Sequence, residues 1–399
     1  MFKKLVALTM AVLMVACCFV FTSCGSTDED DFKIGIICLH DEKSTYDKNF
    51  IDAVYAAQKA LGLKDNQVLI VTNVPEGDEC YQQAANLVDQ GCKVIFADSF
   101  GHEDFMIKAA KAFPEVQFCH ATGVKAKTEG LSNFHNAFSS IYEGRYLAGV
   151  AAGLKLNEMI SSGKITADNA KMGYVGAFTY AEVISGYTSF YLGAKSVCPS
   201  VTMEVQFTGS WFDITEEKNA AEALIDRGCV LISQHADSMG APSACEAKGV
   251  PNISYNLSNA DTCPNSFIIA SKINWQPYFE YIIKTVKDGE NGGKIDTDWC
   301  GSLANGSVVV TAVNEKAAAA GTQAKLDEVA ASLKNGSLKV FDTSTFTVGG
   351  QKLTTYKVGD VEVIKDGYFS ESDVSLYRSG PYFEIAVDGI TRLNEKFGD

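Results

Sequence analysis

The stretch FKIGIICL at residues 32–39, followed by NFIDAVYAAQKAL at residues 49–61, decides the fold class of this chain. The first segment is an apolar run of strand length, and the second carries apolar side chains at helical spacing. A strand followed directly by an amphipathic helix is half of a βα unit, so the pattern predicts an α/β protein. Because ligands of parallel sheets bind beyond the carboxyl ends of the strands, Tyr46 and Asp47, in the polar connection, are the first candidates for a binding surface.

The chain also repeats itself. Segments in the first half recur in the second at nearly constant separation, which indicates an internal duplication and two similar Rossmann-like lobes. The matching pairs are KIG at 33–35 with KMG at 171–173, LVDQGC at 87–92 with LIDRGC at 224–229, and ADSFG at 97–101 with ADSMG at 236–240.

Strands that alternate with helices favour two parallel, doubly wound sheets. The first lobe is predicted at residues 32–140 plus 268–310 and the second at 141–267, with a C-terminal segment at 311–399 completing the lobes. A strand at 267–273 is expected to return to the first lobe. No low-complexity linker divides the lobes, so we expect a hinge that the chain crosses several times and a motion that opens and closes it.

The expected helix at 142–156 is crowded with glycine and alanine. Glycine inside a helix costs about 1 kcal/mol against alanine, so this composition predicts close packing by a neighbouring element. We place the crossing between the lobes near this helix; an ordinary core helix of small residues is the alternative. The predicted secondary structure contains these further strands and helices: strands 67–72, 94–97, 116–120, 132–136, 171–175, 203–207, 230–234, 252–255 and 306–310; helices 79–89, 103–112, 277–287 and 323–335, with others beginning near 180, 213 and 239; and a hairpin pair within 345–363.

The first residues have the form of an export signal. Two lysines precede an apolar run from 5 to 21, which ends in FTSCG at 21–25. Cys24 after two small residues resembles the lipobox of bacterial lipoproteins, which implies a lipidated cysteine at the end of a signal peptide at 1–24, followed by a polar tether at 25–31. An uncleaved anchor and ordinary signal-peptidase cleavage are the alternatives. We therefore expect an extracytoplasmic protein held to the cell membrane by lipid.

Charge and cysteine content limit the partners and the chemistry. The net charge of −15 opposes binding to a nucleic-acid backbone, so no nucleic-acid partner is expected. Three of the twelve cysteines lie in the leader, and those that remain are odd in number and partly within apolar strands. Because no Cys-x-x-Cys pair occurs, we expect mostly buried free thiols rather than metal or redox sites.

The sequence contains no enzyme signature that we recognise. There is no Gly-x-Ser-x-Gly elbow, and the His-Glu pair at 102–103 lacks the second histidine of a zinc-binding helix. The glycine-rich segment at 289–295 lacks the Walker spacing, and the five histidines are scattered. We therefore expect a protein that is not an enzyme and that uses no cofactor and no metal.

Aromatic and polar side chains gather at the predicted strand ends. Two flat side chains on opposite lobes, Tyr46 and Trp211, would sandwich a planar ring, while carboxylates and amides read its edges. Core packing is the alternative for these two rings, and helix capping for Asp98, His235 and Asn256. Lys272 follows the strand expected to return and would donate to the ligand, or lie on the surface. The candidate ligand-binding residues are Tyr46, Asp47, Asp98, Phe100, His120, Thr122, Trp211, Asp213, His235, Asp237, Asn256 and Lys272.

These motifs together resemble the basic membrane protein family of solute-binding lipoproteins, whose best-known members are similar to purine nucleoside receptors of ABC importers. The resemblance covers nearly the whole chain: the FTSCG segment, KIGII at 33–37, Tyr46-Asp47, AA at 109–110 through PEVQF at 114–118, YLAG at 146–149, GSWFD at 209–213, Ser271-Lys272, and Ile390 within DGI at 388–390.

The resemblance implies a type I periplasmic-binding-protein fold and a base clamped by Tyr46 and Trp211, each in place of phenylalanine, with the family's lysine at Lys272. Three positions depart from the family pattern: Asp47 replaces asparagine, and Thr122 and Ser258 replace acids. The implied function is capture of a purine nucleoside for an ABC permease and its ATPase. A flavin or another planar solute, an extracytoplasmic sensor module and a nucleoside hydrolase are the alternatives.

Overall fold

The first strand and helix, in this computed structural model, form the unit that the opening stretch predicts. β1 (Ile34–Ile37) is buried throughout because it is a central strand of a parallel sheet whose faces are covered by helices. α2 (Thr45–Leu61) begins after Ser44, whose side chain accepts a hydrogen bond from the backbone N–H of Asp47. It ends at Gly62, which has the left-handed φ of 67° that glycine adopts at low cost. The polar connection therefore lies at the carboxyl edge of the sheet.

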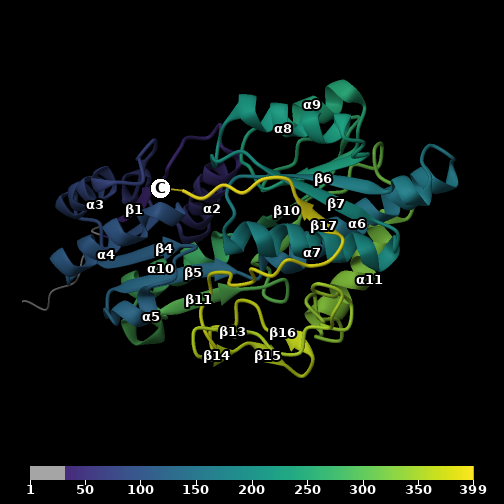
Figure 1. Cartoon of the computed structure of the whole chain (residues 1–399). Coiled ribbons are helices and arrows are strands. Elements are labelled where there is room, and N and C mark those ends of the chain that lie inside the picture. The colour runs from purple at the N-terminus through teal and green to yellow at the C-terminus, as the bar shows by residue number, and fades with distance from the viewer. Residues whose placement is uncertain (1–31, 399) are drawn as a thin grey trace, which may run out of the picture. The chain divides into compact units, whose positions relative to one another are not determined.

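The structure describes residues 32–398, and β1 belongs to the first of two large sheets (Figure 1). The strand order is β11-β5-β4-β3-β1-β2, with every neighbouring pair parallel. α3 packs with α4 on one face, and α2 packs with α10 on the other. The remaining elements of this lobe are β2 (Val68–Val71), α3 (Asp78–Asp89), β3 (Val94–Ala97), α4 (Glu103–Ala112), β4 (Gln117–Ala121), α5 (Ala126–Glu129), β5 (Phe134–Ser139), α10 (Gln276–Lys287) and β11 (Asp298–Gly301).

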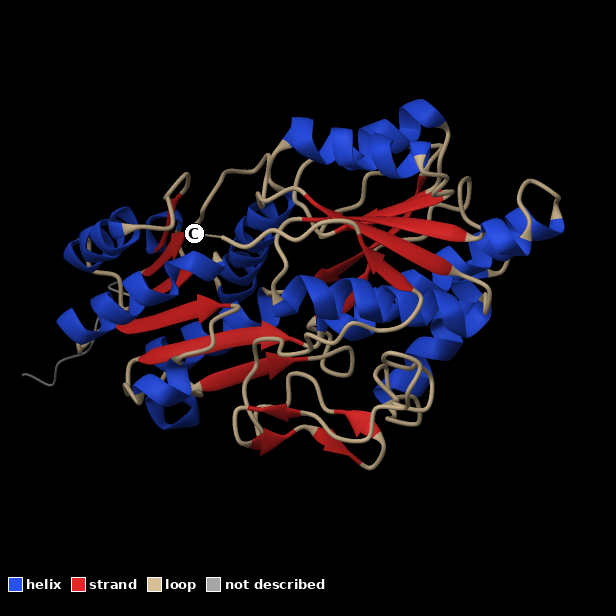
Figure 2. Ribbon diagram, viewed as in Figure 1, coloured by secondary structure: helices blue, strands red, loops and turns tan. Residues whose placement is uncertain are grey.

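The second sheet repeats this plan. Its order is β12-β10-β9-β8-β6-β7-β17, so its first six strands follow the order of the first sheet, although β12 runs antiparallel to β10. α8 and α9 lie on one face, and α6 and α7 lie on the other (Figure 2). The elements of this lobe are α6 (Ile141–Ser161), β6 (Lys171–Gly176), α7 (Ala181–Val197), β7 (Thr202–Phe207), α8 (Ile214–Asp226), β8 (Leu231–Gln234), α9 (Gly240–Lys248), β9 (Asn252–Tyr255), β10 (Phe267–Ile273), β12 (Val308–Val310) and β17 (Ile390–Arg392).

The predicted duplication is visible in equivalent contacts. A Cβ atom at Gly35 would lie 2.8 Å from the side chain of Leu87, and one at Gly173 would lie 3.0 Å from that of Leu224. Each glycine thus lets a later helix of its repeat, α3 in the first lobe and α8 in the second, pack closely on its strand. The lysine two residues before each glycine donates to a carbonyl at the end of that helix: Lys33 to Gln90 and Lys171 to Arg227. The two-lobe fold predicted from the repeats is therefore confirmed.

The placement of one predicted strand is wrong. β10 hydrogen-bonds to β9 and β12, so residues 267–273 stay in the second sheet, and the chain returns to the first lobe only with α10. β12, predicted within the first lobe, also belongs to the second sheet. The sequence prediction misses β11, which completes the first sheet, and β17, which pairs with β7. An apolar strand pattern identifies a strand but does not identify its partners.

The chain changes sheet after β5, after β10 and after β11, as a hinge with several crossings requires. The crossing segments hydrogen-bond to one another: the N–H of Ser140 donates to the carbonyl of Gly301, and that of Asn274 donates to Ser307. The first crossing leads directly into α6, where the glycine-rich composition predicts it.

α6 packs against α7 through direct backbone contact. A Cβ atom at Gly149 would lie 2.0 Å from the carbonyl oxygen of Phe190, and one at Gly193 would lie 2.1 Å from that of Tyr146. No side chain fits between helices this close. The close packing predicted from the small residues of α6 is therefore confirmed.

Replacing Gly149 by alanine is expected to destabilise the protein by about 3 kcal/mol or more, since overpacking here pushes two backbones apart. Urea unfolding of the purified variant measures this loss. Ser161→Ala, at an exposed position of the same helix, is the matched control and should stay within about 0.5 kcal/mol of the parent chain. Equal free energies of unfolding for the parent and Gly149→Ala would contradict the close-packing argument.

The C-terminal segment contacts both lobes. Ser379 donates to Asp298 of β11 through its N–H (2.8 Å) and its hydroxyl (2.5 Å), while β17 extends the second sheet. Within it, Phe341 stacks on Phe383 with ring centroids 4.3 Å apart. Two small hairpins fall within and just beyond the predicted 345–363 pair. The elements are α11 (Thr322–Lys334), β13 (Lys357–Val358), β14 (Val361–Glu362), β15 (Ile364–Lys365) and β16 (Tyr368–Phe369).

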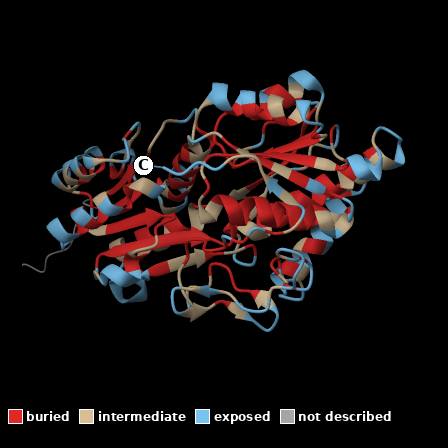
Figure 3. Cartoon of the chain, in the orientation of Figure 1, coloured by how far each residue is buried: buried red, intermediate tan, exposed pale blue. Residues whose placement is uncertain are grey.

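The two sheets form the buried core, and exposed residues concentrate on the outer faces of the helices (Figure 3). The nine cysteines between residues 32 and 398 are all free, and all but Cys300 are buried, which confirms the prediction of buried thiols. Among the described helices, none has the length and apolar character that crossing a bilayer requires. The predicted signal peptide at 1–24, with Cys24, and the tether at 25–31 lie outside the described residues.

Candidate functional site

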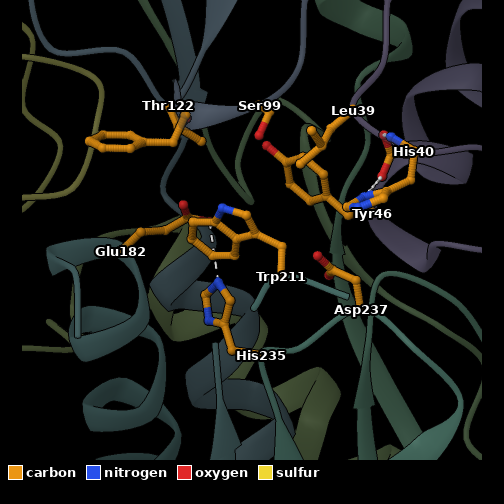
Figure 4. Close-up of a pocket in the computed structure, with 11 residues that line it drawn as sticks. Leu39, His40, Tyr46, Ser99, Thr122, Glu182, Trp211, His235 and Asp237 are labelled. Atoms are coloured by element: carbon orange, nitrogen blue, oxygen red, sulfur yellow. Dashed lines mark hydrogen bonds and ion pairs between the residues drawn. The ribbon is translucent and has the colours of Figure 1, made fainter. Parts of the chain in front are cut away.

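A pocket lies between the lobes, at the carboxyl ends of strands from both sheets (Figure 4). It contains about 370 Å³ of space not filled by protein, its open mouth included. Its position agrees with the rule that α/β sheets bind ligands at this edge. The lining residues are Leu39, His40, Tyr46, Asp47, Ser99, Phe100 and Thr122 from the first lobe, and Glu182, Trp211, His235 and Asp237 from the second.

Tyr46 and Trp211 enter the pocket from opposite lobes, as the sequence analysis expects (Figure 4). The hydroxyl of Tyr46 donates to the carbonyl of Asp98 over 2.9 Å, and its ring packs edge-on against Phe50. Trp211 packs edge-on against Phe178, with ring centroids 5.0 Å apart. These contacts hold both rings in place where they line the pocket.

The lobes touch on both sides of the pocket. The rings of Phe100 and Tyr180 lie 5.3 Å apart, and those of His40 and Phe212 lie 5.4 Å apart. The backbone N–H of Thr45 in the first lobe donates to the carbonyl of Asp237 in the second over 2.9 Å. These contacts describe a closed cleft, so a guest of nucleoside size would enter only when the lobes separate.

Asp47 is held as a carboxylate in the first turn of α2. Its oxygens accept hydrogen bonds from the backbone N–H of His40 (2.7 Å) and the hydroxyl of Ser44 (2.5 Å). Burial acts to raise the pKa of Asp47, but hydrogen bonds from His40 and Ser44 outweigh it and the pKa is lowered. The positive end of the helix dipole favours the same charged form.

Asp98 and Asp237 occupy equivalent places in the repeat, and both are buried. Burial raises the pKa of each well above its usual range, and the nearby carboxylate of Asp47 raises both further. Asp237 lines the pocket, whereas Asp98 lies behind it and accepts from the N–H of Leu39. A carboxyl held neutral in this way can donate a hydrogen bond as well as accept one.

Thr122 follows β4 with a φ of 65°, and Asn256 follows the equivalent strand β9 with a φ of 66°. A β-branched residue in this region is strained, and such strain is concentrated at functional sites. Thr122 lines the pocket, whereas Asn256 lies outside the lining. The repeat thus gives both lobes the same sharp turn at the edge where the pocket forms.

Several candidates have structural surroundings instead. Asp213 caps α8 by accepting from the N–H groups of Thr215 and Glu216. His120 is buried and bonds to the carbonyl of Ser99. Lys272, on β10, lies outside the pocket lining, as do Asp98, Asp213 and Asn256. A ligand contact for these residues stays a prediction.

The sequence prediction misses Leu39, His40, Ser99 and Glu182. Glu182 is an acid in the first turn of α7, the helix that follows the first strand of the second repeat, as Asp47 is in the first turn of α2. Glu182 is not the residue that aligns with Asp47 in the repeat, so the duplication alone does not point to it. Leu39, His40 and Ser99 follow strands directly, but no residue type distinguishes them from other loop residues.

The lining residues suit an uncharged or cationic guest with hydrogen-bond donors. They include the carboxyl groups of Asp47, Glu182 and Asp237 and no lysine or arginine. The buried triplet of Cys38, Asp47 and Asp98 has potential metal-ligand atoms within 4.8 Å of one another. The Asp47 oxygens already accept the hydrogen bonds described above, so we assign no metal to this triplet.

Residues 36–340 match the family described as ABC transporter substrate-binding protein, PnrA-like. A purine-binding protein of Brucella abortus is 36% identical over 231 residues, which cover 58% of this chain and 61% of that protein. A nucleoside-binding protein of an ABC transporter from Lactococcus lactis is 31% identical over 162 residues, which cover 40% of this chain and 42% of that protein. The chain thus spans less than two thirds of the length of these relatives.

Solved structures support the fold alone. An ABC transporter solute-binding protein from Conexibacter woesei superposes with a TM-score of 0.62 at 20% identity, covering 77% of this chain and 98% of that one. A solute-binding protein from Aeropyrum pernix gives a TM-score of 0.63 at 16% identity, covering 78% and 93%. With the family match over most of the described residues, these comparisons show that the chain belongs to the PnrA-like family of ABC transporter substrate-binding proteins.

Proposed function

We propose that this protein captures a purine nucleoside, or a closely similar planar solute, between its lobes and delivers it to an ABC permease. The observation that carries the proposal is that Tyr46 and Trp211, from opposite lobes, line one pocket. Stacking of a base on an aromatic side chain contributes roughly 1 to 3 kcal/mol per contact. The names of the relatives from Brucella abortus and Lactococcus lactis support the same class of ligand.

Lobe closure couples binding to delivery. The open protein admits the solute, and the closed protein, in which Phe100 packs on Tyr180, buries it and forms the surface that a permease recognises. The solute leaves chemically unchanged. We place this cycle outside the cytoplasm, with the chain held to the membrane through a lipid on Cys24.

A sugar is a second candidate guest. A putative glucose-binding protein of an ABC transporter from Haloferax volcanii is 33% identical over 208 residues, which cover 52% of this chain and 49% of that protein. The buried carboxyls of the pocket would also accept hydrogen bonds from sugar hydroxyls. A flavin and a sensor role remain further alternatives; neighbouring permease and ATPase genes would favour transport over sensing.

Mass spectrometry of the small molecule that copurifies, followed by thermal-shift comparison of nucleosides, flavin and sugars, tests the proposal. We expect a purine nucleoside, recovered intact, to stabilise the protein by about 2.7 kcal/mol at a hundred times its dissociation constant. Stabilisation by sugars and not by any nucleoside would overturn the nucleoside proposal. Release of free base from inosine or adenosine would favour a hydrolase.

A further inference from the structure

We propose that Glu182 recognises a hydrogen-bond donor on the ring edge of the guest, and that Arg145 and His235 hold its carboxylate in position for this role. The inference rests on the proposed function, because it names the edge of the bound ring that the second lobe contacts. Three linked contacts, each made by a buried or nearly buried side chain, carry it from α6 to the pocket.

The first contact fixes which nitrogen of His235 accepts. Arg145, on α6, is only 1% exposed; its Nη1 donates to the carbonyl of Gln234 over 2.9 Å, and its Nη2 lies 3.0 Å from Nδ1 of His235. Its guanidinium also lies 3.4 Å from the ring centroid of Tyr255. Because a guanidinium has donors only, Nδ1 of His235 must be the unprotonated, accepting nitrogen.

The second contact follows from the first. With a lone pair on Nδ1, the proton of a neutral imidazole is on Nε2, which lies 3.3 Å from Oε1 of Glu182. The hydroxyl of Tyr174 also faces Nδ1 at 3.4 Å, where it can donate to the same lone pair. Burial lowers the pKa of His235, and the charge of Arg145 lowers it further, although Glu182 acts in the opposite direction, so the ring stays neutral. Gly186 leaves room for the ring, since a Cβ atom there would lie 3.0 Å from Nδ1.

The third contact places the carboxylate at the guest. Glu182 lines the pocket with a side chain that is 11% exposed, and among residues 32–398 its carboxylate has no hydrogen-bond partner besides His235. After burial, the charge of Glu182 is the largest influence that raises the pKa of Tyr46, so the carboxylate lies close to the ring proposed to stack on the guest. A carboxylate there accepts only, so it pairs with a ring N–H or amine and repels a ring acceptor.

The ring edge of the guest then determines its affinity. Guanosine offers N1–H and an amino group side by side, inosine offers N1–H alone, and purine riboside offers no donor on that edge. The protein is expected to bind these three nucleosides in that order. One hydrogen bond to a charged acceptor separates inosine from purine riboside by roughly tenfold or more, and the second donor of guanosine adds to this difference.

Isothermal titration of the three nucleosides against Glu182→Gln tests the role of the carboxylate. We expect the variant to lose roughly tenfold or more in affinity for guanosine and little in affinity for purine riboside, because an amide presents one acceptor and adds a donor. The matched control is Glu216→Gln, an exposed glutamate in the first turn of α8, which should leave all three constants unchanged. The inference would be overturned if Glu182→Gln lost the same affinity for all three nucleosides. It would also be overturned if the loss disappeared for nucleosides that lack a ribose hydroxyl.

Nitrogen-15 NMR of the histidine side chains tests the positioning residues without any ligand, with His235 assigned by its absence from a variant spectrum. We expect an unprotonated Nδ1 and a protonated Nε2 in the parent protein. His235→Leu should abolish the preference for guanosine over purine riboside, whereas His235→Gln, which can still donate to Glu182, should retain part of it. A protonated Nδ1, or a preference unchanged in His235→Leu, overturns the positioning role.

These outcomes are distinguishable from failure of the proposed function. If no purine nucleoside binds the parent protein, the proposed function fails, and the specificity assigned to Glu182 fails with it. If nucleosides bind but guanosine, inosine and purine riboside bind equally, only the present inference fails.

Discussion

Trp211→Ala is expected to weaken binding of a purine nucleoside by about 5- to 150-fold, because it removes one of two stacking surfaces worth roughly 1 to 3 kcal/mol each. Tyr46→Ala should give a loss of the same size from the other lobe. Both rings line the pocket while each packs edge-on against one neighbouring aromatic residue. Titration calorimetry with the nucleoside that stabilises the parent protein measures the effect.

Matched variants separate stacking from general damage. Trp211→Phe keeps a flat ring and should recover most of the affinity lost in the alanine variant. Tyr55, on the same helix as Tyr46, is 49% exposed and lies outside the pocket lining, so Tyr55→Ala is expected to bind as the parent does. If the dissociation constant were unchanged in both Trp211→Ala and Tyr46→Ala, stacking between these two rings would not contribute to binding.

The repeats show why so much of the fold could be predicted. KIG at 33–35 and KMG at 171–173 place a glycine at the same point in two strands, where a later helix approaches closely, so the repeated motif marks the same packing in both lobes. The position of β10 was not predictable in the same way. Its seven residues would form a strand in either sheet. The sheet to which it belongs is decided by its hydrogen bonds with β9 and β12, and the sequence pattern of the strand does not reveal these partners.

The site likewise contains some residues that the sequence alone marks as candidates and others that only the folded structure brings to the pocket. Tyr46 and Trp211 could be proposed because an aromatic side chain in a polar loop is unusual. Glu182 looks like any acid in the first turn of a helix, where the dipole stabilises it. Its position beside the pocket depends on Arg145 and His235, which come from other elements of the second lobe and meet only in the folded protein.

A 5′-phosphate on the nucleoside is expected to weaken binding by at least about a hundredfold, because the pocket offers it no cation. The lining residues include three carboxyl groups and no lysine or arginine. Arg145 is committed to Gln234 and His235, and Lys272 lies outside the lining. Asp237 is held neutral and Glu182 is assigned to the ring edge, so the carboxylate of Asp47 is the charge that opposes the phosphate. Two like charges 5 Å apart repel by about 3 kcal/mol at an effective dielectric constant near 20, which corresponds to more than a hundredfold in affinity.

The helix N-termini at the pocket do not provide a binding site for the phosphate. A free helix N-terminus attracts anions, but α2 carries Asp47 and α7 carries Glu182 in the first turn, so each positive end already faces a carboxylate. Titration of a nucleoside and of its 5′-monophosphate measures the difference in affinity between them. The control is a 5′-amino-5′-deoxynucleoside, which carries the opposite charge and is expected to bind at least as well as the nucleoside. Added salt should reduce the difference in affinity between nucleoside and monophosphate, because it screens the repulsion. Dissociation constants for nucleoside and monophosphate that agree within threefold would show that the carboxylates do not face the guest.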